Sequence, residues 1–285
     1  REEKDFKQAK TYLAKAIEKK DSLAQNALYH LGICCIETND KSNAKAMFKE
    51  ASEMDFDMTI KEKALLNYAK VACETSSAYN EPLKAFQTFT EQFPNSDKAN
   101  EAKEYLAQLY GEMKNYRDAI EMIEQMSERN LSVNKAYQRL CLNRAIELFN
   151  ENRTDDALIY LDKSLSQTHD NSLTAAAYYL KAEAYHQMGE YELSIKNLNT
   201  FYSVPGADKS QFVSQADYAM GYNLFRQKKY SIAKGYFQRA IGKIRKEQSD
   251  DACLRYADCL YMCREFSAAI SEYDKIIAQQ LQDAD

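Results

Sequence analysis

The chain has 285 residues, of which only 7 are Gly and 3 are Pro, so it has few residues for long loops, and no Gly-rich phosphate loop occurs. Lys and Arg number 38 against 43 Asp and Glu, and the net charge of −5 argues against nucleic-acid binding, which depends on clustered positive charge. Many Ala, Leu, Lys, Glu and Gln, which are strong helix formers, predict an all-α protein.

Small residues recur along the chain at intervals of 36 to 39 residues, each on a predicted first helix of a helix pair. They are Gly32, Ala69, Ala107, Ala145, Ala182, Gly221 and Ala257. A second set marks the partner helices, and a large apolar residue follows each member four places later, on the same helix face. This set is Ala9, Ala44, Ala85, Ala119, Ala157, Ser194, Ala233 and Ala269. Small residues let two helix backbones approach closely, so the pattern predicts repeated antiparallel helix pairs.

The predicted elements follow one another in a single array over 1–285, without a linker of low complexity. A half repeat covers 1–21, and full repeats follow at about 25–56, 61–94, 99–129, 134–168, 172–203, 211–246 and 250–280. Turn residues such as Asn39 and Gly189 separate the two helices of a pair. The chain begins inside a repeat and its last helix lacks a polar capping partner, so we expect it to be part of a longer protein.

The repeated motifs resemble the tetratricopeptide repeat, or TPR. Examples are Leu28-x-x-Leu31-Gly32-x-x-Cys35 on a first helix and Tyr230-x-x-Ala233-x-x-x-Phe237-x-x-Ala240 on a second helix. The resemblance covers seven full repeats and implies a right-handed α-solenoid of stacked antiparallel helix pairs, the TPR superhelix. The period is nearer 37 than the family's 34 residues. It looks like the long-period type of bacterial envelope proteins, which favours a periplasmic over a cytoplasmic setting.

The inner, concave face of such a superhelix is lined by the first helices. Residues three before, one after and four after each small residue share that face. In the later repeats this face is rich in aromatic side chains, which are favoured anchors in protein interfaces. We therefore predict a groove for a peptide or a partner helix, lined by Tyr179, Glu183, His186, Tyr218, Tyr222, Phe225, Arg226 and Tyr261. An alternative is that tight curvature packs these aromatic residues against one another or against another repeat.

Catalytic, metal and cofactor sites are not expected. His30, His169 and His186 are scattered, and no nucleophile turn is present. The seven Cys have irregular spacing and no CxxC, which argues against a disulfide framework and leans towards a reducing compartment. No apolar run reaches the ~18 residues of a membrane span, so we expect no direct insertion of this segment into a membrane.

Three functional hypotheses remain at this level. The first is a protein-interaction scaffold whose partner is a protein or peptide. The second is a structural or homo-oligomerising TPR segment of a larger envelope or signalling protein. The third, a hydrolase, requires a deep polar pocket that the sequence does not locate.

Overall fold

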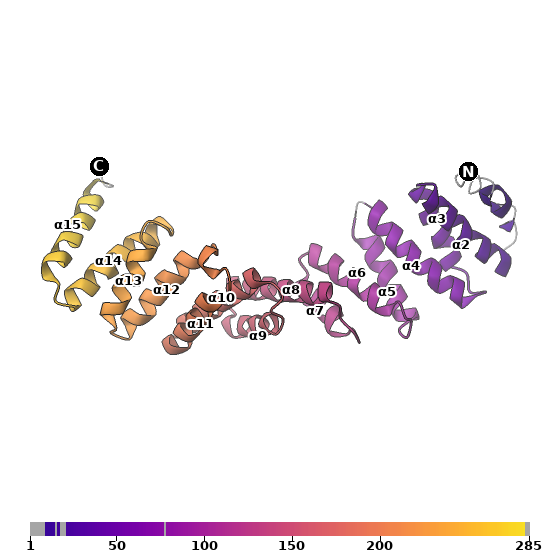
Figure 1. Ribbon diagram of the computed structural model, residues 1–285. Helices are drawn as coiled ribbons and strands as arrows, with labels where there is room; N and C mark the ends of the chain where they lie inside the picture. The colour runs from indigo at the N-terminus through magenta and orange to yellow at the C-terminus, as the bar shows by residue number, and fades with distance from the viewer. Residues whose placement is uncertain (1–8, 15, 18–20, 77, 283–285) are drawn as a thin grey trace. The chain divides into compact units, whose positions relative to one another are not determined.

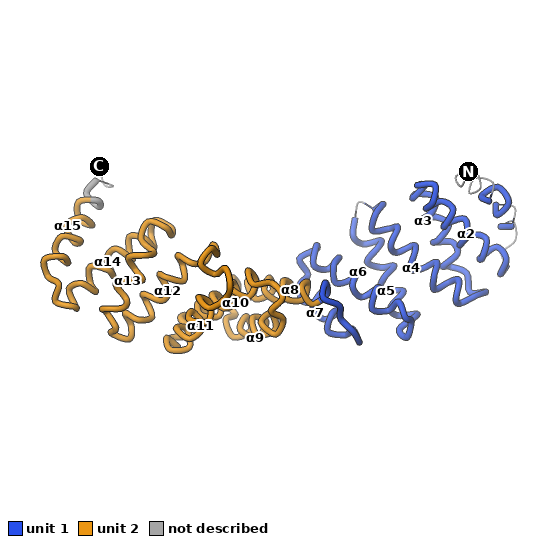
Figure 2. Tube along the Cα trace, viewed as in Figure 1, with its two compact units in different colours: residues 1–133 blue, residues 134–285 orange. Residues whose placement is uncertain are grey.

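The computed structural model describes residues 9–14, 16–17, 21–76 and 78–282, and all regular structure in these residues is helical. The chain forms two compact units, residues 1–133 (unit 1) and 134–285 (unit 2), which Figure 2 shows in different colours. Each unit is an α-solenoid in which antiparallel helix pairs stack in chain order. The all-α solenoid prediction is therefore confirmed, whereas a single array over both units stays a prediction.

Unit 1 contains three helix pairs (Figure 1). They are α2 (Ser22–Glu37) with α3 (Lys41–Ser52), α4 (Met58–Thr75) with α5 (Asn80–Gln92), and α6 (Ala99–Glu112) with α7 (Tyr116–Glu124). The predicted half repeat over 1–21 lies largely outside the described residues, among which 9–14 are helical. Its Lys10 ammonium donates a 2.7 Å hydrogen bond to the Thr38 hydroxyl at the end of α2.

Unit 2 contains four helix pairs, the first of which starts just before the division. They are α8 (Leu131–Asn150) with α9 (Thr154–Leu165), α10 (Asn171–Gln187) with α11 (Tyr191–Ser203), α12 (Val213–Arg226) with α13 (Tyr230–Ala240), and α14 (Lys246–Met262) with α15 (Phe266–Gln282). A 3-10 turn, η1 (Ala207–Lys209), precedes α12. The sequence placed the end of the sixth pair at 246. The structure ends α13 at Ala240, because Ile241 leaves the helical conformation with ψ 130° and Gly242 follows with φ +74°.

The small residues lie where two helices cross. Gly32 of α2 faces Phe48 of α3 so closely that an added Cβ would lie 2.5 Å from the Phe48 ring. At Gly221 of α12 the same construction gives 3.0 Å to the Phe237 ring of α13. Phe48 and Phe237 are both fully buried. The sequence predicted small residues at the crossings with large residues beside them. The structure shows that these two glycines each face the large residue of the second helix.

The turns inside the pairs share one conformation. Six of them place a residue with left-handed backbone at the same position, five residues before the small residue of the second helix. These residues are Asn39, Lys114, Asn152, Gly189, Lys228 and Arg264. The next backbone N–H then donates to a carbonyl five residues back, as in Asp40 N–H to Cys35 O at 2.8 Å. This is the Schellman end of a helix, and it turns the chain back antiparallel.

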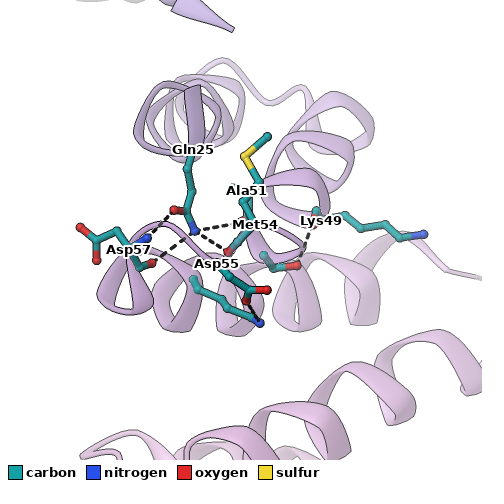
Figure 3. Close-up of polar contacts among 8 residues, drawn as sticks. Gln25, Lys49, Ala51, Met54, Asp55 and Asp57 are labelled. Atoms are coloured by element: carbon teal, nitrogen blue, oxygen red, sulfur yellow. Dashed lines mark hydrogen bonds and ion pairs between the residues drawn. The ribbon is translucent and has the colours of Figure 1, made fainter. Parts of the chain in front are cut away.

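A buried glutamine ties one repeat to the next. Gln25 of α2 accepts a 2.7 Å hydrogen bond from the Asp57 N–H, and its amide donates to the carbonyl oxygens of Ala51, Met54 and Asp57 at 3.2, 2.7 and 3.2 Å (Figure 3). Asp57 in turn caps the N-terminus of α4. The loop between two repeats is therefore held by one fully buried side chain.

The same arrangement recurs in unit 2. Gln138 of α8 accepts a 3.0 Å hydrogen bond from the N–H of Asp170, which caps α10. Its amide donates to the Asp170 carbonyl and the Thr174 hydroxyl at 3.1 and 3.0 Å. Both glutamines are seven residues before the small residue of their helix and 32 residues before the capping Asp. We call these two residues the glutamine clamps.

Candidate functional site

The eight predicted groove residues all belong to unit 2 and to its first helices. Helix α10 carries Tyr179, Glu183 and His186, helix α12 carries Tyr218, Tyr222, Phe225 and Arg226, and helix α14 carries Tyr261. Consecutive first helices α10, α12 and α14 are neighbours across the stack, and contacts join α10 to α12 and α12 to α14. The repeat pattern alone predicts this neighbourhood.

Three of the predicted residues surround one buried ring. Tyr218, Tyr222 and Phe225 meet Phe237 of α13 with ring centroids 6.2, 6.2 and 6.4 Å away, each in an edge-on arrangement. We call these four residues the aromatic cluster. Phe237 is fully buried, whereas the other three are partly exposed. Their inner edges therefore belong to the core and their outer edges to the surface. The rings pack against one another, as the alternative expected, and the groove stays a prediction.

Tyr179 lies deeper than the aromatic cluster. Its ring stacks on Phe212, 5.0 Å between centroids, and meets the buried Phe201 edge-on at 6.5 Å. Burial raises the pKa of Tyr179 far above its usual value, and the nearby Glu183 carboxylate raises it further. The Tyr179 hydroxyl is thus neutral at all physiological pH and acts as a polar edge of an apolar surface.

His186 is held by a chain of buried polar groups. Its Nδ1 lies 2.7 Å from Asn223 Oδ1, the Asn223 amide donates to the Ser194 hydroxyl at 2.7 Å, and that hydroxyl donates to the Ala182 carbonyl at 2.8 Å. Because Asn223 Oδ1 is an acceptor, Nδ1 of His186 must carry the proton. The ring also meets Tyr222 edge-on at 5.8 Å and Tyr191 at 5.6 Å. The imidazole is therefore fixed in orientation, with Nε2 as its remaining polar atom.

Glu183 lies between Tyr179 and His186 on the same strip of α10. Its carboxylate makes no hydrogen bond or ion pair with any described residue. Burial raises the pKa of this carboxyl, and the nearby His186 opposes the rise. Glu183 is thus a partly buried acid without a direct ion-pair partner among the described residues, and only the nearby His186 offsets the effect of its burial.

Three charged groups of α14 form one paired network. Asp251 accepts a 2.8 Å hydrogen bond from the Tyr218 hydroxyl, and Arg255 bridges Asp251 and Asp258 at 3.4 and 2.6 Å. The Arg255 guanidinium also lies 5.7 Å from the centroid of the Phe225 ring. Asp258 accepts a further 2.7 Å hydrogen bond from the Tyr273 hydroxyl. This network fixes the rings of Tyr218 and Phe225 against α14.

Arg226 and Tyr261 lie at the margin of the site. Arg226 is exposed, and its guanidinium lies 5.7 Å from the centroid of the Tyr222 ring. Tyr261 is 55% exposed and packs edge-on against Phe266 of α15, 5.5 Å between centroids. The structure therefore brings the predicted residues of α10 and α12 together, while Tyr261 belongs to an exposed apolar surface at the end of unit 2.

Sequence reasoning missed Phe212, Asn223 and the Asp251–Arg255 pair. Phe212 directly precedes α12, where the repeat pattern has no assigned position. Asn223 could have been noticed in the sequence. It lies two places after the small residue of its helix, and the other six first helices have an apolar residue or Glu at that position. Ser194 had a similar signal, since the other second helices have Ala there.

No group of three or more His, Cys, Asp or Glu in the described ranges is placed to hold a metal ion. None of the helices in the same ranges is long and apolar enough to cross a membrane.

A protein-family model matches two segments of the chain. The tetratricopeptide repeat model matches residues 25–58, which span α2 and α3, and residues 175–204, which span most of α10 and α11. The same pair geometry, with its small residue, large residue and Schellman turn, recurs between and beyond these segments. The chain contains tetratricopeptide repeats. TPR arrays are generally binding scaffolds rather than enzymes, and this repeat type indicates a protein-interaction scaffold.

Comparison with other proteins adds little to this assignment. No curated protein matches the chain. Among solved structures, PilF of Pseudomonas aeruginosa is 15% identical, with 92% of this chain and 97% of that chain covered at a TM-score of 0.45. A TPR protein of Parabacteroides merdae is 20% identical, with 90% and 93% covered at 0.39. The TPR2AB domain of yeast Sti1, in complex with an Hsp90 peptide, is 15% identical, with 82% and 98% covered at 0.35.

Proposed function

We propose that the surface formed by α10 and α12 of unit 2 binds an extended peptide or a helix of a partner protein. The observation that carries the proposal is the aromatic cluster, whose outer edges are exposed while Phe237 and the α14 network hold the rings in place. Tyr and Phe side chains fixed before binding lose little conformational entropy when a partner arrives. They are also the residues that most often anchor protein interfaces.

The surface around the rings also fits a peptide rather than a small molecule. Along α10 and α12, partly exposed rings lie beside polar groups, among them the exposed Arg226 guanidinium and the partly exposed His186. An extended peptide presents apolar side chains and backbone polar groups that can meet both kinds of group. No catalytic group is assigned to this surface, so the proposal is binding without chemistry.

Selection of random peptides displayed on phage, with the full chain as bait, tests this proposal. We expect peptides whose affinity falls at least about tenfold in Tyr222→Ala, the scale of an interface hot spot. Ile232→Ala is the matched control, because Ile232 is 54% exposed on the second helix α13 of the same pair. Thermal unfolding of both variants separates lost binding from lost folding. Equal affinity for wild type and a folded Tyr222→Ala chain would show that the rings serve stability alone.

One observation favours homo-oligomerisation as the second candidate function. Exposed apolar side chains gather at the end of unit 2, where Tyr261, Met262, Phe266, Ile270 and Ile277 are each at least 50% exposed. Phe266, Ile270 and Ile277 follow helical spacing on α15 and share one face. Exposed apolar faces of this kind mark association surfaces in soluble proteins.

A further inference from the structure

Glu183 differs from the other acids around the proposed binding surface. Asp251 and Asp258 are both paired with Arg255. Asp217, which is buried on α12, accepts hydrogen bonds from Tyr202 and Arg239 at 2.8 and 2.9 Å. Glu183 alone of these four acids has neither a donor nor a cation among the described residues.

No neighbour of Glu183 among the described residues makes a direct hydrogen bond or ion pair with it. His186 is one turn away, but its Nδ1 proton is used by Asn223, and that bond fixes the ring. The Arg226 guanidinium lies over the Tyr222 ring and forms no ion pair with a described residue. The groups next to Glu183 along α10 are the neutral hydroxyphenyl ring of Tyr179 and the imidazole of His186. An acid among aromatic rings, without its own cation, is an incomplete ion-binding arrangement.

We propose that Glu183 receives the cationic side chain of a Lys or Arg residue of the bound peptide, with the face of an adjacent tyrosine ring beside the cation. The inference rests on the proposed function of this surface. A carboxylate that gains a cation in a poorly hydrated site forms a strong charge-assisted hydrogen bond, and an aromatic face adds a cation–π contact. The net charge of −5 also favours encounter with a basic peptide.

The pKa of the carboxyl agrees with this role. Burial raises it in the free protein. An approaching cation stabilises the charged form and lowers the pKa again. The partial burial of Glu183 thus favours peptides that carry a cation over peptides that do not, because only a cation forms an ion pair with the carboxylate.

The test compares peptides selected on the wild-type chain with their binding to Glu183→Gln. We expect the selected peptides to share one Lys or Arg. Replacing that residue by norleucine in the peptide, or Glu183 by Gln in the protein, should each weaken binding about tenfold. The two changes together should weaken it little more than either alone, because both remove the same pair. Glu192→Gln, an exposed acid on the second helix α11, is the matched control and should bind as wild type.

The outcomes separate this inference from the proposed function. Selected peptides that depend on Tyr222 but carry no shared cation, or that bind Glu183→Gln unchanged, would overturn the role of Glu183 and leave the binding surface intact. Failure to select any peptide that depends on Tyr222 would overturn both. Because Gln has the shape of Glu and removes an uncompensated buried acid, Glu183→Gln should fold, and thermal unfolding verifies this.

Discussion

At the scale of single residues, the packing of this protein is set by the distance between small and large side chains. Ala44, Ala157 and Ala233 are fully buried, and the large residues Phe48, Leu161 and Phe237 that follow them are fully buried as well. One added methyl group at a close crossing therefore has nowhere to go unless a ring moves. The distance from an added Cβ to the facing side chain therefore predicts which substitutions destabilise the protein more.

Three glycines give a graded test of this rule. Gly32→Ala should destabilise the protein by about 1–3 kcal/mol, since the new Cβ lies 2.5 Å from the Phe48 ring. Gly221→Ala, at 3.0 Å from Phe237, should cost less, because a small shift of the ring suffices. Gly235→Ala on α13 meets nothing within 4 Å and should stabilise the helix by about 0.5–1 kcal/mol. Urea unfolding measures all three, and equal effects would refute the packing rule.

The small residues, the large residues and the positions of most turns could be predicted from the sequence, because each recurs at a nearly fixed spacing. The left-handed backbone in these turns was not predicted, since Lys114, Lys228 and Arg264 do not favour it. The face carrying Tyr179, Tyr218 and Tyr222 could be predicted for the same reason. Asn223 was missed because a polar residue on a helix is normally assumed to face solvent. Phe212 was missed because it lies outside the repeat. Burial of individual polar groups depends on side-chain contacts between repeats, and spacing alone does not determine it.

At the scale of helices and loops, polar side chains of the first helices hold the loops that join one repeat to the next. The glutamine clamps join the first helix of one repeat to the N-cap of the next. In unit 1 the equivalent positions of α4 and α6 hold Glu62 and Asn100, which are hydrogen-bonded to Ser96 and Ser127. A polar side chain seven residues before the small residue thus reaches the following loop in four consecutive repeats.

Loss of a glutamine clamp should loosen the loop it holds. Gln138→Leu leaves the Asp170 N–H without its partner in a partly buried place, and we expect a loss of about 1–3 kcal/mol in unfolding free energy. Gln187→Leu, an exposed Gln at the end of α10, is the control and should have little effect. Hydrogen exchange should show faster exchange at the start of α10 in Gln138→Leu. Unchanged stability and exchange would contradict the clamp.

An ion pair at the start of α5 should make unit 1 sensitive to acid. Hydrogen bonds from Ser76, Lys45 and Tyr68 lower the pKa of Glu81 to about 2. A lowered carboxyl pKa stabilises the fold fully above the ordinary value near 4.5, and this stabilisation is lost as the pH falls towards 2. Wild type should exceed Glu81→Gln in stability at pH 7, and the difference should shrink between about pH 5 and 2. Solvent exposure of the pair limits the size of the effect. A difference that is constant with pH would refute the assignment.

At the scale of the whole molecule, the first helices of unit 2 serve both stability and the proposed binding. In an array whose repeats contact mainly their neighbours, stability is close to a sum over repeats and their interfaces. Buried residues of both helices of each pair supply that sum, while the first helices of unit 2 also expose the outer edges of aromatic rings and an acid without an ion-pair partner. The residues that we assign to binding are those whose contacts within the chain are incomplete.

Self-association separates the two candidate functions. The scaffold account predicts a monomer whose mass, measured by light scattering, does not change with protein concentration. A mass that rises with concentration, and that falls back in Phe266→Ser with Ile270→Ser, would instead support oligomerisation through α15. These two side chains are 51% and 61% exposed, so the substitutions should not disturb folding.

The central claim, that the α10–α12 surface of unit 2 is where a partner peptide lies, is tested most directly by photo-crosslinking. Benzoylphenylalanine is placed at Arg226 or at Ile232, two exposed positions on the first and second helix of the same pair. With a selected peptide, the account predicts a crosslink from position 226 and none from position 232. A crosslink from 232 without one from 226 would place the peptide on the outer helices and contradict the account.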